Sequence, residues 1–396
     1  MSKYNDITIH QTLSASTQER RVLLSCGGRY YEASPAIAEL VEELQSHDTE
    51  GEAIAAYVEK KAGKYTPEQV RQIIDKFITP LFAPTETKRS FLYEKELFTA
   101  QAIDRFSDRF SFLFHKVYMS VVLALALVGD IYFFWYTPDL FLFNNKVNVY
   151  LVIGLFVFML VSSFFHELGH ASACKYFGVR HGGVGFGLYL TFPVLYTDVT
   201  EIWKLNRRQR CVVNLAGVYF QSYWLILLLV AFFMTGDDIL RYLILIMNLG
   251  FLMTLNPFFK FDGYWIASDL LGVPNLRQRS IELFKYLYRR IRKWSTAQKP
   301  YLLQIRPLER YGLLLYSIVV NLFMGFYFFY VIPRFLYRFV GTFPEAVHEL
   351  ILYLSNGMTP PFALLRNIGS QLLFLALIGY MLWKIVQPLF KRYVRS

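Results

Sequence analysis

The sequence predicts a polytopic α-helical membrane protein of about six spans with a small N-terminal α+β domain of winged-helix-like form. The first observation is the composition. Of the 396 residues, 55% are hydrophobic and 18% aromatic, and the mean hydropathy is +0.32, which is too apolar for a soluble protein. The second observation is the distribution. Long apolar runs begin only after residue 116, whereas the first 84 residues show short strand and helix patterns.

Residues 1–84 are predicted to form the N-terminal domain. Two short β-rich runs, 21–25 and 29–33, flank Gly27-Gly28, a pair typical of a tight hairpin. Ser34-Pro35 then starts a helix, with serine as its cap and proline at its first position. A second helix is expected near residues 50–62, and a capping box at Thr66-Pro67-Glu68-Gln69 starts a third. The domain holds no convergent catalytic set.

Residues 85–116 are predicted to be a polar, amphipathic linker. Apolar side chains recur there among charges, so part of the linker is expected to lie on the membrane surface. These side chains are Phe91, Leu97, Phe106, Phe110 and Phe114.

Six apolar segments follow, each long enough to cross the hydrocarbon layer. They are Val117–Tyr136, Val149–Cys174, Val212–Met234, Ile239–Phe259, Tyr311–Tyr330 and Gln371–Leu389. We expect a membrane core over 117–275, a basic cytoplasmic loop over 276–310 and C-terminal transmembrane helices over 311–396. Asp130, inside the first span, must face the helix bundle or water, and is a lesser functional candidate.

The net charge of +11 indicates the orientation of the chain and is not taken as a sign of nucleic-acid binding. Basic residues gather in alternate loops, for example at 204–210 and 277–293, whereas an opposite loop carries Asp237-Asp238. Since positive loops stay inside, both termini are expected in the cytoplasm, with the chain multi-pass in the cytoplasmic (inner) membrane.

The chemistry centres on His166-Glu167-Leu168-Gly169-His170, near the end of the second span. Histidines four apart lie on one face of a helix and can bind one metal ion. The intervening glutamate can then act as general base on a metal-bound water. Ionisable groups are costly in a membrane helix and imply function there. Cys174, one turn after His170, is interpreted as a packing residue.

A catalytic zinc needs one further protein ligand beside two histidines and water. Asp262 is the first choice, because it follows the fourth span and reaches a depth similar to that of the histidines. Pro257 breaks that span and lets the chain turn. Asp198 is the reserve ligand. His181 and Glu201 are further polar candidates nearby.

Residues 179–203 are rich in glycine and β-formers, and predict a hairpin that dips into the membrane. We expect its free edge to pair with an extended substrate segment. The predicted contacts there are Gly185, Gly187 and Tyr189.

His166-Glu167-Leu168-Gly169-His170, followed by Asn256-Pro257 and Asp262-Gly263, resembles the site-2 protease family of intramembrane zinc metalloproteases. The closer likeness is to its bacterial branch of peptide zinc metalloproteases. The resemblance implies that His166, His170 and Asp262 bind Zn²⁺, that Glu167 is the catalytic base, and that Asn256 and Asn214 contact substrate. The chain departs from the family pattern in lacking a proline after Ala216-Gly217 and in having Phe261 before Asp262.

Residues 5–82 resemble the PqqD-like peptide-recognition domains, on the strand Arg29-Tyr30-Tyr31-Glu32 and the helix that Pro35 begins. This resemblance implies that a leader peptide adds to the sheet edge and packs on a helix. The alternative is a folded regulatory cap.

The expected reaction is hydrolysis of a peptide bond in a membrane-associated or leader-bearing peptide precursor, a step of peptide maturation. The expected partners are this substrate, the lipid bilayer, and a peptide-modifying enzyme or exporter, with no nucleic acid. Two alternatives stay open: a protease that releases a membrane-tethered regulator, and a non-catalytic scaffold for peptide binding and export. A transporter is disfavoured, since the spans show no internal repeat.

Overall fold

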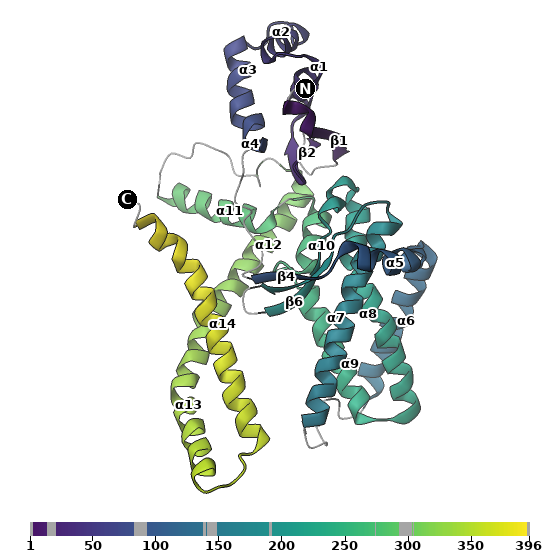
Figure 1. The fold of residues 1–396 in the computed structure, drawn as a ribbon, viewed down its shortest axis with the longest axis vertical. Coiled ribbons are helices and arrows are strands. Elements are labelled where there is room, and N and C mark those ends of the chain that lie inside the picture. The colour runs from purple at the N-terminus through teal and green to yellow at the C-terminus, as the bar shows by residue number, and fades with distance from the viewer. Residues whose placement is uncertain are drawn as a thin grey trace. The chain divides into compact units, whose positions relative to one another are not determined.

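The structure is a computed structural model, and it is mostly helical (Figure 1). It describes residues 3–13, 21–82, 93–137, 140, 149–189, 192–273, 275–292, 303 and 305–393. Backbone contacts divide the chain into two compact units, each described by itself. The first comprises Met1–Lys88, Glu201–Arg210 and Ala267–Ser317, and the second comprises Arg89–Thr200, Cys211–Ile266 and Ile318–Ser396.

The first unit begins with a three-stranded antiparallel sheet of order β1-β2-β3. Its strands are β1 (Ile7–Leu13), β2 (Arg21–Cys26) and β3 (Arg29–Ala33). The β2–β3 hairpin is confirmed, and Gly27 and Gly28 both have positive φ, at 55° and 74°. Such angles suit a two-residue turn that matches the strand twist. Strand β1 was not predicted from the sequence.

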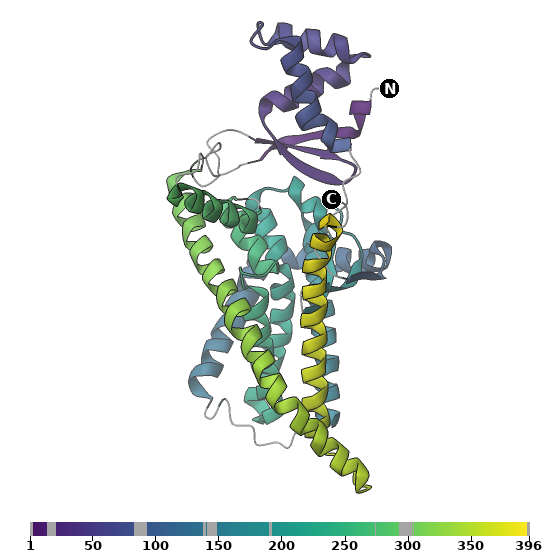
Figure 2. The ribbon, with the colours of Figure 1, turned by 90° about the vertical axis from the view of Figure 1, so that its left-hand side faces the viewer.

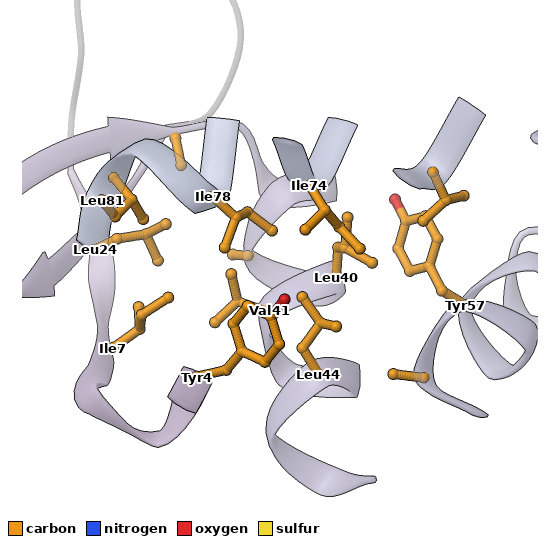
Figure 3. Packing of buried hydrophobic residues seen from close by; sticks show 14 of the residues in the cluster. Tyr4, Ile7, Leu24, Leu40, Val41, Leu44, Tyr57, Ile74, Ile78 and Leu81 are labelled. Carbon is orange, nitrogen blue, oxygen red and sulfur yellow. The ribbon is translucent and has the colours of Figure 1, made fainter. Parts of the chain in front are cut away.

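Helices pack on this sheet, and the first and third of them begin at the capping residues that the sequence predicted. They are α1 (Pro35–Ser46), α2 (Glu50–Lys60), α3 (Pro67–Ile73), the π-turn η2 (Ile74–Ile78) and α4 (Thr79–Phe82), after a short 3₁₀ turn, η1 (Lys3–Asp6). The Ser34 hydroxyl accepts from the Ile37 amide, and Thr66 with Gln69 forms a capping box. Figure 3 shows side chains from strands and helices meeting in one apolar core. Its labelled members are Tyr4, Ile7, Leu24, Leu40, Val41, Leu44, Tyr57, Ile74, Ile78 and Leu81.

Among the described residues, five helical segments are long and apolar enough to cross a membrane, which indicates a membrane protein. They are α6 (Lys116–Tyr136), α7 (Val149–Tyr176), α8 (Arg207–Thr235), α12 (Pro307–Phe326) continued through η6 (Tyr327–Val331) and α13 (Ile332–Ser355), and α14 (Phe362–Tyr393). Half of the α8 span is buried, against at most 22% of the others, so α8 is the central helix of the set.

The predicted fourth span corresponds to α9 (Asp238–Thr254), which ends five residues before the predicted Phe259. Its 17 residues are at the lower limit for a bilayer-crossing helix. The amide of Asn248 on α9 donates to Asp130 on α6 at 2.8 Å, so Asp130 faces a neighbouring helix as expected. The helices α13 and α14 form a hairpin (Figure 2). Ile332 and Ile378 belong to one buried apolar cluster there.

A second antiparallel sheet has the order β4-β5-β6. Its strands are β4 (Tyr93–Phe98), β5 (Val184–Tyr189) and β6 (Phe192–Thr197). The predicted hairpin is β5–β6. Strand β4 comes from the segment expected to be only a linker, which also forms the helix α5 (Ala100–Phe110) and the 3₁₀ turn η3 (Ser111–Phe114). Because β4 pairs with β5, the hairpin edge that β5 was expected to offer is occupied, and β6 is a terminal strand.

Candidate metal centre

The structure brings together His166 and His170 from α7 and Asp262, the first residue of α10 (Asp262–Leu271). Asp262 Oδ2 lies 2.9 Å from Nε2 of His166 and 3.2 Å from Nε2 of His170. The two Nε2 atoms are 3.1 Å apart. These three atoms form a nearly equilateral triangle. Ligands about 2.1 Å from a tetrahedral zinc lie about 3.4 Å from one another, so the triangle is only slightly smaller than one face of such a site.

The hydrogen bonds on the far sides of the rings decide which nitrogens face this triangle. Nδ1 of His166 lies 3.1 Å from Oε1 of Gln221, and Nδ1 of His170 lies 2.7 Å from the carbonyl of Val213. Both partners are acceptors, so both Nδ1 atoms carry the proton and both Nε2 atoms present lone pairs.

When both imidazoles are neutral, their two Nε2 lone pairs and the Asp262 carboxylate converge on one point. Asp262 Oδ2 is buried, and it makes no hydrogen bond with any described residue. A cation at the centre of the triangle would relieve this mutual repulsion. Two imidazoles and one carboxylate are a donor set that suits zinc, so the residues present fit the metal that the sequence predicts.

Gln221 was missed by the sequence reasoning, although it orients a proposed ligand. Its Nε2 donates to the Ser162 hydroxyl at 2.8 Å, which fixes the amide so that Oε1 faces His166. Gln221 lies one helical turn after Gly217 on α8. Its polar amide within a predicted membrane span was the signal that could have found it.

Small residues let α7 and α8 approach closely enough for this contact. A Cβ at Gly217 would overlap the imidazole of His166, and a Cβ at Gly169 would overlap the carbonyl of Ala216. Glycine at both positions therefore sets the distance between the two helices, as small residues commonly do between membrane helices.

The turn that carries Asp262 is built by residues expected to bind substrate. Asn256 Oδ1 accepts from the Phe258 amide at 2.8 Å, which closes an Asx turn just after α9. The Tyr189 hydroxyl accepts from the Lys260 amide at 3.0 Å, so β5 holds this turn from the other side. A Cβ at Gly263 would overlap the Leu255 carbonyl, so glycine is needed directly after the carboxylate.

Glu167 is 6% exposed and lies between the two histidines on α7. It interacts electrostatically with His170. Its backbone carbonyl accepts from the Thr197 hydroxyl at 3.2 Å. This bond joins the end of β6 to the turn of α7 that carries His166, Glu167 and His170.

The remaining predicted residues take other places. Gly185 and Gly187 lie in the central strand β5, each paired with β4 on one side and β6 on the other. A Cβ at Gly185 would overlap the ring of Tyr196, so this glycine makes room for that ring. Asn214 is buried on α8, directly after Val213. The role of Gly185, Gly187 and Asn214 in substrate binding therefore stays a prediction.

The reserve residues lie outside the triangle. Asp198 Oδ1 accepts from the Thr200 amide at 3.0 Å, at the start of the 3₁₀ helix η4 (Thr200–Lys204), which also contains Glu201. His181 is buried, and its Nε2 is hydrogen-bonded to the Ser107 hydroxyl of α5 at 2.8 Å. Within the described part of the chain, neither Asp198 nor Cys174 joins a group able to hold a metal.

A second contact fastens α5 to the end of α7. The Asp104 carboxylate of α5 pairs with Lys175, and this hydrogen bond holds the pKa of Asp104 below its ordinary value. Together with the Ser107–His181 bond, it ties the segment after β4 to the helix that carries His166 and His170.

The chain is similar to one curated protein, "Putative peptide zinc metalloprotease protein YydH" of Bacillus subtilis (strain 168). The two are 30% identical over 124 residues, which are 31% of this chain and 49% of that protein. The chain thus spans about half the length of the relative that it matches. No family model matches the sequence, and no solved structure matches it.

Proposed function

We propose that this chain is a zinc metalloendopeptidase of the site-2 protease type, which cleaves a leader-bearing or membrane-associated peptide precursor within or at the edge of the bilayer. One observation carries the proposal: Nε2 of His166, Nε2 of His170 and Oδ2 of Asp262 converge within 3.2 Å of one another, and Glu167 lies in the same helical turn. The name of the Bacillus subtilis relative supports the same chemistry.

His166, His170 and Asp262 would hold the zinc, which when bound supplies a Lewis acid and a water whose pKa is lowered to about 7. Glu167 takes a proton from the attacking water as its oxygen bonds to the scissile carbonyl carbon. The same carboxyl group then gives that proton to the amine nitrogen as the C–N bond breaks. Gln221 and the Val213 carbonyl keep both imidazoles in the required tautomer throughout.

The substrate would approach as an extended strand beside β6. A helix uses its carbonyls in its own hydrogen bonds, so a membrane-spanning substrate must unwind before attack. Pairing with a terminal strand replaces part of the backbone hydrogen bonds that the substrate loses when its helix unwinds. β6 is suited to this role because Thr197 joins it to the backbone of Glu167. The sequence predicted that the substrate pairs with β5. Because β4 already pairs with β5, this proposal places the substrate beside β6.

The wider setting is proposed on the sequence. The distribution of basic residues supports a cytoplasmic-membrane location with both termini inside. The N-terminal sheet with its three main helices supports a PqqD-like module that recruits a leader peptide.

The test measures zinc content and cleavage on detergent-purified full-length protein. The variants are Glu167→Gln and, as a matched control, the exposed Glu349→Gln, which also follows a histidine. The substrates are a leader-bearing precursor encoded beside the gene and a membrane-tethered protein. We expect about one zinc per chain in all three proteins. Wild type and Glu349→Gln should cleave the precursor, and Glu167→Gln should not.

Each other outcome changes a specific part of the proposal. Normal cleavage by Glu167→Gln would contradict the assignment of the base. Zinc binding with cleavage of the tethered protein alone would favour the release of a regulator. Wild-type protein without zinc would contradict the enzyme and favour the scaffold.

A further inference from the structure

The apolar face of α11 (Leu276–Ile291) is covered along only half of its length. In the first half, Leu276, Ser280 and Leu283 are buried. On the same face, Leu287 and Ile291 are 42% and 81% exposed. Residues three and four apart share one side of a helix, so a single apolar face leaves the protein interior part-way along α11.

The uncovered half is also basic. Lys285, Arg289 and Arg290 are exposed there, and none of them forms an ion pair with another residue of the described chain. The helix has five basic residues and one acidic residue, Glu282, which already pairs with Arg279 at 2.9 Å. Arg290 lies about 60° around the helix from Leu287 and flanks the exposed apolar side chains, whereas Lys285 and Arg289 lie about 160° from Leu287, on the polar side of the helix.

The place of α11 in the chain points to the occupant of this surface. The helix lies between α10 and α12, and α12 begins one of the candidate membrane spans at Pro307. A basic amphipathic helix that precedes a membrane segment in the chain is suited to the headgroup region of a bilayer. Anionic headgroups complement its lysine and arginine side chains, and the boundary with the acyl chains accepts its apolar ones.

We propose that the second half of α11 binds the surface of the bilayer in which the chain is embedded. Leu287 and Ile291 enter the headgroup boundary, and Arg290 beside them contacts anionic phospholipid headgroups. Lys285 and Arg289, on the polar side of the helix, add positive charge that attracts the same headgroups over a longer distance. This inference does not depend on the proposed proteolysis. It makes α11 a surface anchor between the helix that begins with Asp262 and the next span.

The experiment places an environment-sensitive NBD label on the full-length protein at Ile291→Cys. Cys211→Ser removes the partly exposed cysteine, whereas Cys26 and Cys174 are buried. The protein is reconstituted in nanodiscs of phosphatidylcholine, with or without phosphatidylglycerol, and brominated lipid is used as quencher. The matched control is Gln278→Cys, at an exposed position about 140° away around the helix.

With phosphatidylglycerol, the label at position 291 should emit at shorter wavelength and be quenched several-fold more than the label at 278. Replacing Lys285, Arg289 and Arg290 with glutamine should return the quenching to the level seen in phosphatidylcholine alone. High salt should act in the same direction, since it screens these charges.

Three results would overturn the proposal. The first is a label at 291 that is as exposed to water as the label at 278 in both nanodiscs. The second is a shift in emission at 291 without quenching by brominated lipid, which would indicate a protein partner such as a second copy. The third is equal quenching with and without phosphatidylglycerol, which would show that anionic headgroups do not contribute to the contact.

Discussion

Oε1 of Gln221 lies 3.1 Å from Nδ1 of His166, and the Ser162 hydroxyl holds the same amide from its other end. The contact spans α7 and α8 and fixes both the tautomer and the tilt of the imidazole. A residue that touches no substrate therefore decides whether His166 presents a lone pair to Asp262.

Replacing Gln221 with leucine should weaken zinc binding by about 10- to 100-fold, because the His166 ring loses its acceptor. Competition with a chromogenic chelator measures this affinity. Gln221→Glu is the matched control. Its carboxylate can still accept from both His166 and Ser162, so zinc should be retained. Wild-type affinity in the leucine variant would show that Gln221 does not orient the ring.

Gly217→Ala should disrupt the metal site by steric overlap. The added methyl group would enter the space of the His166 ring, and such overpacking costs about 1–3 kcal/mol. We expect a lower melting temperature and weaker zinc binding. Gly154→Ala on α7 is the control, because a Cβ there meets nothing within 4 Å. Equal effects of the two substitutions would contradict the packing argument.

Tyr189→Phe should disturb the position of Asp262 without changing a ligand. It removes the hydroxyl that accepts from the Lys260 amide in a partly buried hydrogen bond, and the loss of such a bond costs about 1 kcal/mol. Zinc affinity should fall by about five-fold or more. Tyr337→Phe, at a side chain that is 83% exposed, should leave zinc affinity unchanged. If Tyr189→Phe retained zinc but raised KM, Tyr189 would contact substrate as the sequence predicted.

The buried ion pair of Arg210 and Asp269 should contribute strongly to stability in the first unit. Arg210 Nε donates to Asp269 Oδ1 at 2.7 Å, and both side chains are 8% exposed. Removing one partner should cost about 3–5 kcal/mol, because the other charge stays buried and unpaired. Thermal unfolding in detergent should show a large fall for Asp269→Leu and a recovery when Arg210→Met is added.

The control for that pair is Lys204 with Glu201, which lie 2.8 Å apart at about one-third exposure. Water screens such pairs, so Glu201→Gln should change the stability by less than about 1 kcal/mol. Similar losses of stability at both pairs would show that burial does not determine how much stability the removal of Asp269 costs.

Local features of this protein followed from the sequence. Spacing on one helix put His166 and His170 on a common face, and Gly27-Gly28 supplied the positive φ angles of a hairpin. The capping box of Thr66 and Gln69 and five of the six predicted spans also depend on residues close in sequence. Asp262 was predicted as the third ligand from the topology, since alternate spans return the chain to the same depth in the membrane.

Other features could not be predicted from local patterns, because they join residues far apart in the chain. Strand β4 pairs with β5 although about ninety residues separate them, and its glutamates and lysine gave no strong strand signal. The sequence by itself identified Glu167 and the two histidines as candidate site residues. The tertiary structure alone decided that Gln221 orients His166 and that Tyr189 holds the turn of Asp262. Those contacts depend on how closely α7 approaches α8 and how β5 meets the loop after α9, and side-chain packing sets both distances.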